Sequence, residues 1–271
     1  MGRLIIQANL TLPFWADYLP YLDQLGGEQI TDCGRLNALL PDGLKSEAGQ
    51  AIRFVPSTEL DDGAYEHRIY TTGQVSTRPD NWHDLFNALV WMRFPRLKVT
   101  MNSLHYHAIS HPSAGSRGPL RDALTLFDEC GVIVLSNHVE ILNALAQRRW
   151  SDAFHSGSFH DDVQIAVFGH AMLEKYLSPY KSMTAKALLI QADANVMALS
   201  REEKLVFLDR VLAKQLKAGD ILSRPACLAP LPLAGIPGWW PDAEQNEEFY
   251  ADEQVFRPPP AKITPAPVIH I

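Results

Sequence analysis

The segment that follows Asn81 carries apolar side chains around most of a helical turn. They recur at the spacing of one helix face, at Trp82, Leu85, Phe86, Leu89 and Val90. Asn81 can cap such a helix with its side-chain oxygen, and Pro95 disfavours helical geometry at the residue before it. We therefore predict a short helix between these two residues, buried because it is apolar nearly all round.

The polar sector of this helix is narrow and holds His83, Asp84 and Asn87. An unpaired polar group in an apolar interior costs roughly 1–3 kcal/mol, so each of them must be hydrogen-bonded, bind a ligand or face water. We expect the three residues to line a polar pocket inside an apolar body. The alternative is a core histidine that simply hydrogen-bonds to a backbone carbonyl.

Short apolar strands alternate with helices between residues 131 and 218. The predicted strands are VIVLS, VQIAVFG and ALLIQA, and the last helix, REEKLVFLDRVLAKQL, has Ser200 as its cap. This alternation is typical of parallel β-α-β units. The predicted fold class is therefore α/β, with a small parallel or mixed sheet flanked by helices. Residues 1–130 are predicted to be helix-rich, although EHRIYTT, from Tyr65, has the composition of a strand.

Residues 224–271 show neither a helical nor a strand period and carry many of the 19 prolines. Their aromatic side chains nevertheless argue against a purely disordered tail. We expect residues 1–223 to form a single α/β core domain and residues 224–271 to wrap it as an extended segment. The alternative is an arm that binds a protein partner, in part through polyproline conformation.

Charge and cysteine content narrow the class of protein. A formal net charge of −7 argues against a dedicated nucleic-acid binder, which needs a basic face. Arg93, Arg96 and Lys98 form a local basic cluster, which we interpret as a solvated helix end. The three cysteines are widely spaced and fit a reducing compartment. No apolar run is long enough for a signal peptide or a membrane span, so we predict a soluble, cytoplasmic protein.

A first candidate site follows the second predicted strand. Ligands of open α/β sheets sit beyond the carboxyl ends of the strands, and Gly169 and His170 come at such an end. Glu174 lies one helical turn after His170, on the same face. A histidine and a carboxylate in this arrangement can share a metal ion or transfer protons. A purely structural bond between His170 and Glu174 is the alternative.

A second candidate is the helix that begins at Pro119. Asp122, Thr125 and Glu129 share one stripe of it, with Arg121 at the edge. Carboxylates on such a stripe could bind Mg²⁺, Mn²⁺ or Ca²⁺. The alternatives are a solvated acidic face and a plain ion pair between Arg121 and Asp122.

A third candidate is the group His105, His107 and His111, whose first two members form a His-x-His pattern. A His-x-His pattern on a strand points both rings to one side, as some zinc sites require. Exposed or capping histidines are the alternative. The sequence lacks a Gly-rich phosphate loop, a G-x-S-x-G elbow and an H-E-x-x-H motif.

Four parts of the chain together resemble one known family. They are TRPDNWHDLFNALVWMRFPR, RDALTLFDECGVIV, VFGHAMLEK, and LPLAGIPGWW with FYADEQVFRP. These segments resemble a bacterial family of proteins of unknown function, DUF3025, from roughly Tyr65 to Pro258. The resemblance implies that they belong to one domain and that their polar residues can share one site. It implies no activity, cofactor or catalytic residue.

Two functional hypotheses follow from these patterns. The first is a metal-dependent hydrolase or lyase that acts on a small substrate and holds Zn²⁺, Mn²⁺ or Mg²⁺. Its metal ligands would come from His83, Asp122, Glu129, His170 and Glu174. Its catalytic groups, including a general base and substrate-orienting side chains, would come from His83, Asp84, Asn87, Arg121 and Glu174. The second hypothesis is a non-catalytic binding or scaffold protein, with a structural polar network and a C-terminal arm that docks a protein partner.

Overall fold

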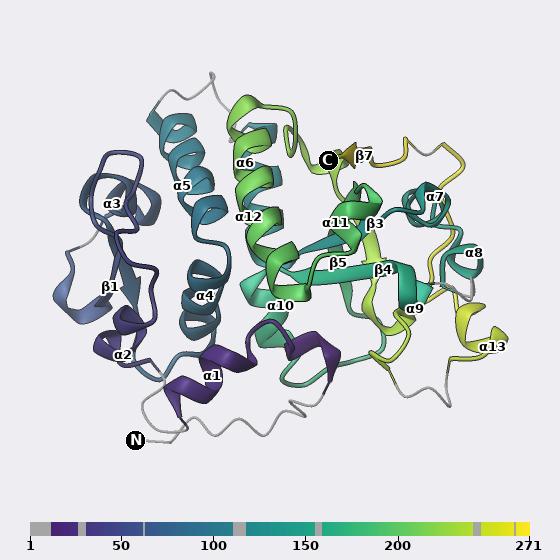
Figure 1. The fold of residues 1–271 in the computed structure, drawn as a ribbon, viewed down its shortest axis with the longest axis horizontal. Coiled ribbons are helices and arrows are strands. Elements are labelled where there is room, and N and C mark those ends of the chain that lie inside the picture. Colours follow the sequence, from purple (N-terminus) through teal and green to yellow (C-terminus); the bar gives the residue numbers. More distant parts are fainter. Residues whose placement is uncertain are drawn as a thin grey trace.

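The computed structural model describes residues 12–26, 31–61, 63–110, 118–154, 159–240, 245–262 and 264–271. Its N-terminal part consists of short elements: η1 (Pro13–Trp15), α1 (Leu19–Leu25), α2 (Cys33–Ala38), β1 (Arg53–Pro56), η2 (Ser57–Glu59), α3 (Tyr65–Thr72) and β2 (Gln74–Thr77). Strands β1 and β2 pair in parallel as a small separate sheet. Helices α2 and α3 and strand β1 lie beyond α4 (Trp82–Arg93) and α5 (Pro95–Ser110), away from the main sheet (Figure 1). Helix α1 lies closer to that sheet, and the hydroxyl of Tyr18, its N-cap residue, donates to the carbonyl oxygen of Val167.

The predicted strand at EHRIYTT is wrong, because the segment forms helix α3. Its β-branched and aromatic residues favour a strand only weakly, and tertiary packing overrides that preference. Ile69 is buried, and the helix packs against α5. It ends at Gly73, whose φ of +73° suits glycine and whose position would bring a Cβ to 2.0 Å from the carbonyl oxygen of Ala51.

The predicted buried helix is confirmed as α4 (Trp82–Arg93), and α5 (Pro95–Ser110) follows it directly. Asn81 is the N-cap of α4 and accepts a hydrogen bond of 3.0 Å from the amide of Asp84. The start of α5 is capped from elsewhere in the chain. Asp209 of helix α12 (Arg201–Ala218) accepts from the amides of Leu97 and Arg96 at 2.9 and 3.2 Å.

The main sheet is mixed, with the order β4-β3-β5-β6 and with β7 also paired to β5. Its strands are β3 (Gly131–Ser136), β4 (Val163–Val167), β5 (Thr184–Gln191), β6 (Ala229–Pro232) and β7 (Val268–His270). Strands β3 and β5 are parallel, as predicted. The expectation of a parallel β-α-β unit is wrong for β3 and β4, because these strands are antiparallel. The chain between them returns to the edge where β3 ends, so that Val163 lies opposite Ser136.

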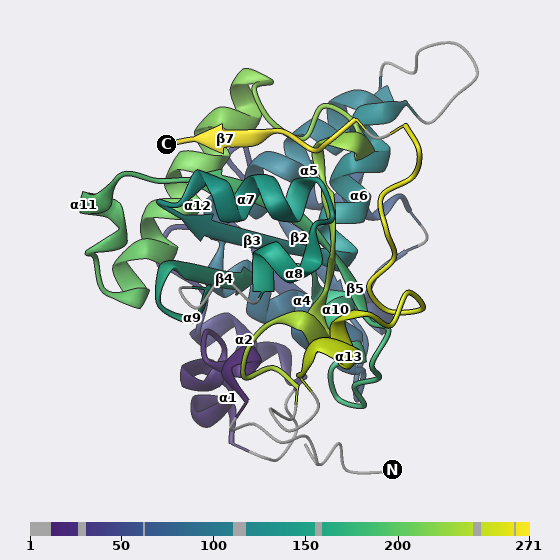
Figure 2. The ribbon, with the colours of Figure 1, turned by 90° about the vertical axis from the view of Figure 1, so that its right-hand side faces the viewer.

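Helices cover both faces of this sheet and give a three-layer α/β core (Figure 1). On one side lie α4, α5, α6 (Pro119–Cys130) and α12. On the other side lie α7 (Val139–Ala146) and α8 (Trp150–Phe154), which stand in front of the sheet in Figure 2. The remaining helices are the short α9 (Phe159–Asp162), α10 (His170–Lys175), α11 (Ala194–Met197) and α13 (Glu247–Tyr250).

The C-terminal segment is built into the sheet rather than only laid over it. It contributes η3 (Pro225–Cys227), β6, η4 (Leu233–Gly235), α13 and β7. Both of its strands pair with β5, β6 with residues 184–187 and β7 with residues 189–191. Strands of three or four residues are too short to show a period in the sequence. Trp239, Phe249, Tyr250 and Phe256 are buried, so these aromatic groups anchor the segment to the core.

Within the described part of the chain, no helix combines the length and the apolarity that crossing a membrane requires.

Candidate metal centre

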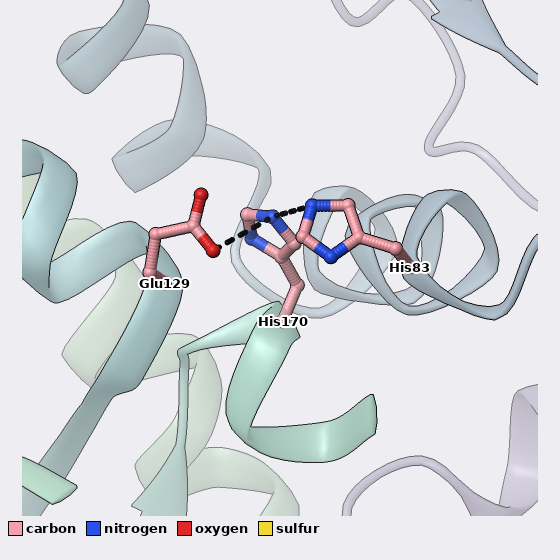
Figure 3. Close-up of side chains that lie close together, drawn as sticks. All are labelled: His83, Glu129 and His170. Atoms are coloured by element: carbon pink, nitrogen blue, oxygen red, sulfur yellow. Dashed lines mark hydrogen bonds and ion pairs between the residues drawn. The ribbon is translucent and has the colours of Figure 1, made fainter. Parts of the chain in front are cut away.

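Three side chains from three helices lie close together: His83 from the first turn of α4, Glu129 from the last turn of α6, and His170 from the start of α10 (Figure 3). One potential ligand atom of each lies within 4.8 Å of those of the other two. The Nε2 atoms of His83 and His170 are 2.9 Å apart, and Glu129 Oε2 lies 3.8 Å from His170 Nε2. This group could hold a metal ion.

The antiparallel direction of β4 brings His170 to Glu129. The amides of Phe168 and Gly169 donate to the carbonyl oxygen of Gly131 at 2.9 and 2.8 Å, which ties the end of β4 to the start of β3. Residue 169 has to be glycine, because a Cβ there would lie 2.5 Å from the amide nitrogen of Gly131. His170 therefore emerges beside Glu129, two residues before β3 begins. The expectation that β4 is a parallel strand of the sheet is therefore wrong, and His170 lies at the edge where β3 begins.

Each histidine also has a carboxylate near its second ring nitrogen. Glu174 Oε2 lies 3.0 Å from His83 Nδ1, within hydrogen-bond distance. Asp128 Oδ2 lies 3.8 Å from His170 Nδ1, which is buried and makes no hydrogen bond in the described part of the chain. Histidine ligands of metal ions commonly show this arrangement, with one nitrogen toward the ion and the other toward a carboxylate or carbonyl group.

Glu174 therefore contacts His83 from α4 and not the His170 that precedes it on α10. The alternative interpretation, a purely structural bond between His170 and Glu174, is therefore wrong. Helices α4 and α10 pack against each other. His170 and Glu174 lie on the face of α10 toward α4, and they contact the two ring nitrogens of His83, Nε2 and Nδ1 respectively. Glu174 lies outside the three-residue group and contacts its His83 ring.

The electrostatics keep the buried histidine neutral. Burial lowers the pKa of His170 to about 4, even though the nearby Asp128 carboxylate favours the charged form. Burial would also raise the pKa of Asp128. The Lys98 ammonium, 2.6 Å away, and the nearby His170 outweigh it, so that the pKa of Asp128 is lowered. Burial raises the pKa of Glu129. A neutral imidazole is the form that binds a metal ion.

The three residues line a cavity of about 480 Å³, which is within the size range of small-molecule sites. Several predicted site residues line it: His83, Asp84, Asn87, Arg121, Thr125, Glu129 and His170. Asp122 does not, because it is exposed near the N-terminal end of α6. It lies about 10 Å along the helix axis from Glu129, at a rise of 1.5 Å per residue. The face of α6 toward the cavity instead carries Arg121, Thr125, Asp128 and Glu129.

The polar sector of α4 faces this cavity. Both carboxylate oxygens of Asp84 accept from the Arg78 guanidinium, at 3.0 Å from Nε and 2.7 Å from Nη2. Asn87 donates to the hydroxyl of Tyr65 at 2.8 Å and accepts from Lys98 Nζ at 3.0 Å. These hydrogen bonds occupy many of the donor and acceptor positions of Asp84 and Asn87. Catalytic roles for these two residues stay predictions.

Two residues that the sequence did not indicate contribute to this region. Lys98 is only 5% exposed and bonded to Asp128, so its assignment to a solvated basic cluster is wrong. Glu66, on the helix mistaken for a strand, lines the cavity. Burial raises its pKa to about 7, although Asn102 donates to its Oε2 at 2.7 Å. The neighbouring sequence of either residue carries no signal of burial, because that burial depends on distant segments.

The His-x-His pair lies on helix α5 and not on a strand, so its two rings point in different directions. His105 is buried and lines the cavity. His107 is exposed outside it, with Nε2 3.5 Å from the hydroxyl of Tyr70. The prediction that both rings share one side is wrong, and His111, the third histidine of this candidate, lies outside the described residues.

Comparison with known protein families gives a match over most of the chain. The DUF3025 family, described as proteins of unknown function, matches residues 52–259. The match covers most of the chain, and the chain therefore belongs to this family. It includes all three residues of the candidate metal centre. Searches of curated proteins and of solved structures found no significant match.

Proposed function

We propose that this DUF3025 protein is a metal-dependent hydrolase, or a related lyase, that acts on a small substrate. The divalent ion would be bound by His83 Nε2, His170 Nε2 and a Glu129 carboxylate oxygen. The observation that carries the proposal is the geometry of the two histidines. Their Nε2 atoms face each other at 2.9 Å, and each Nδ1 faces a carboxylate.

The donor set favours some ions over others. Two imidazoles and one carboxylate are the ligands of several catalytic zinc sites, which keep a fourth position for water. Mg²⁺ prefers oxygen ligands and an octahedral shell, so it suits this group less well than Zn²⁺ or Mn²⁺. The ion would polarise a carbonyl or phosphoryl oxygen and lower the pKa of a bound water molecule.

The surrounding residues would handle protons and orientation. Glu66 lines the same cavity, and its pKa of about 7 suits a general base at neutral pH. It is not one of the three candidate ligands, so it stays available to the substrate or to water. Glu174 would hold the His83 ring in place through Nδ1.

A second candidate function is a non-catalytic binding or scaffold protein. One observation favours it: 2.9 Å is also a normal length for a direct hydrogen bond between two imidazoles. The histidines, Lys98 and Asp128 would then form a structural network. A docking arm within residues 224–271 would supply the partner contact, although β6 and β7 of that segment are also parts of the sheet.

Metal content separates the two candidates. The protein is purified without chelators or added metal and measured by mass spectrometry, next to His83→Ala, His170→Ala and the control His107→Ala. The enzyme proposal expects nearly stoichiometric Zn²⁺ or Mn²⁺ in the wild type and the control, and little in the other two variants. Trace metal in every preparation, with no thermal shift on adding Zn²⁺, Mn²⁺ or Mg²⁺, would leave the scaffold candidate.

A further inference from the structure

The cavity contains a cationic side chain that the metal centre does not use. Arg121 lines the cavity from the first turn of α6, and Glu129 lines it from the last turn. Eight residues separate them, which is about 12 Å along the helix axis. Thr125 lies between them and also lines the cavity. The two ends of this wall are therefore chemically different, one cationic and one suited to a metal ion.

Arg121 lacks a counterion. Its Nε is buried and has no hydrogen-bond partner among the described residues. Within those residues, no carboxylate forms an ion pair with its guanidinium. The neighbouring cations are different: Arg78 is paired with Asp84, and Lys98 with Asp128.

Glu66 does not act as the missing counterion. A carboxylate paired with a guanidinium has a depressed pKa. The pKa of Glu66 is raised instead, to about 7, because burial outweighs the favourable influence of Asn102, Lys98 and Arg121. At neutral pH the carboxyl is therefore protonated in a large share of the molecules and leaves Arg121 uncompensated.

Helix electrostatics do not explain Arg121 either. The N-terminal end of a helix carries a partial positive charge, so a cation in the first turn is unfavourable there. Gly118, the N-cap, has no side chain that could accept from the amides of this turn. Asp122 is the acidic residue of this turn, but it is exposed and does not line the cavity. An anion bound beside Arg121 inside the cavity would balance the charge of its guanidinium.

We propose that Arg121 binds a carboxylate group of the substrate, so that the cavity accepts small carboxylate-bearing molecules whose reacting bond lies at the His83–Glu129–His170 centre. The guanidinium fork matches a carboxylate with two parallel hydrogen bonds. This inference rests on the proposed function for the end of the substrate that reacts. The Arg121 end stands on its own observations.

Charge favours a carboxylate over a phosphate group. Of the arginines that line the cavity in the described residues, Arg78 is neutralised by Asp84. One uncompensated cation then faces a wall that also contains the acidic residues Glu66, Asp128 and Glu129. A group with a single negative charge is balanced by Arg121, whereas a doubly charged phosphate would be left with excess negative charge among acidic neighbours.

Thermal shift and calorimetry with simple anions test the proposal. The probes are the linear dicarboxylates from succinate to azelate, inorganic phosphate, and the uncharged diamide of adipic acid, each at millimolar concentration. Wild-type protein, Arg121→Gln, Arg121→Lys and the control Arg224→Gln are compared, both metal-free and loaded with Zn²⁺. Arg224 is exposed and does not line the cavity. Circular dichroism and the melting temperature without ligand report folding.

The proposal expects that at least one dicarboxylate, but not the diamide, stabilises the wild type and Arg224→Gln. Affinity should fall about 10- to 100-fold in Arg121→Gln and less in Arg121→Lys. Arg121→Gln should melt no lower than the wild type without ligand, because it removes an uncompensated charge. Equal dicarboxylate binding by wild type and Arg121→Gln, or none by either, overturns the proposal. Tighter binding of phosphate than of every dicarboxylate, lost in Arg121→Gln, overturns the choice of carboxylate.

The metal-free arm separates this inference from the proposed function. Dicarboxylate binding that depends on Arg121 without Zn²⁺ supports the Arg121 site even if no metal binds at the histidines. If Zn²⁺ binds but no dicarboxylate effect depends on Arg121, the metal centre stands and the Arg121 site is wrong.

Discussion

His83 and His170 point their Nε2 atoms at each other across 2.9 Å, although 87 residues separate them in the chain. Each belongs to the first turn of its helix, and those helices, α4 and α10, pack together. Glu129 completes the group from the end of α6. Three elements of the fold thus place potential ligand atoms at one point in a cavity wall.

Glu174→Gln tests whether the carboxylate behind His83 supports a metal ligand. The glutamate contacts His83 Nδ1 at 3.0 Å and lies outside the candidate ligand group. We expect metal affinity to fall about 10- to 100-fold, because the ring loses the partner that fixes its tautomer and orientation. Competition titration with a chromophoric chelator measures the change. Glu248→Gln, at an exposed position outside the cavity, should bind metal like the wild type. An unchanged affinity in Glu174→Gln would mean that this carboxylate does not support the ligand.

Lys98→Met tests the ion pair between Lys98 and Asp128. Lys98 is 5% exposed, and its Nζ lies 2.6 Å from Asp128 Oδ1. Removing Lys98 leaves the partly buried Asp128 carboxylate, 19% exposed, without its cationic partner, so the free energy of unfolding should fall by about 3 kcal/mol. The double variant Lys98→Met/Asp128→Asn should recover a large part of that loss. Urea unfolding measures both, with the exposed Lys214→Met expected within about 0.5 kcal/mol of the wild type. A small effect in Lys98→Met would show that the pair is solvated.

Asp209 gives a prediction about pH that does not involve the metal centre. Burial raises its pKa to about 6, against the favourable amides of Leu97 and Arg96. In the unfolded chain an aspartate has a pKa near 4. The pKa in the folded state is higher, so the folded state binds the proton more tightly than the unfolded state. The stabilisation from this group is therefore complete below about pH 4 and is lost as the pH rises through about 6.

Comparing the wild type with Asp209→Asn isolates this effect. As the pH rises from 4 to 7, the unfolding free energy of the wild type should fall relative to that of Asp209→Asn, by up to roughly 1.4 kcal/mol per pH unit. Urea titrations at several pH values measure it, and Asp220→Asn serves as an exposed control. Parallel curves for the wild type and Asp209→Asn would contradict the raised pKa.

The local signals in the sequence located the helices that carry the site. Asn81 marks where α4 begins, Pro95 marks where α5 begins, and Pro119 marks the start of α6. Helical spacing then placed the polar sector of α4 on one face, and that face lines the cavity. Caps and periodicity act over a few residues, so they can be read without knowing the fold.

The arrangement of those helices in space was beyond such signals. Strand composition does not reveal direction, so β4 was expected to run parallel to β3, and His170 was assigned to the wrong edge of the sheet. Glu174 was expected to act with His170, four residues away, yet it contacts His83, 91 residues away. The burial of Lys98 likewise depends on Asp128 and Asn87, which only the folded chain brings near.

X-ray absorption spectroscopy of the Zn²⁺-loaded protein tests the central claim most directly. Our account predicts a first shell of only nitrogen and oxygen ligands at about 2.0–2.1 Å. It also predicts outer-shell scattering from two imidazole rings, reduced to one ring or lost in His170→Ala. A spectrum with sulfur at about 2.3 Å, or with oxygen ligands and no imidazole scattering, would contradict a metal centre at His83, Glu129 and His170.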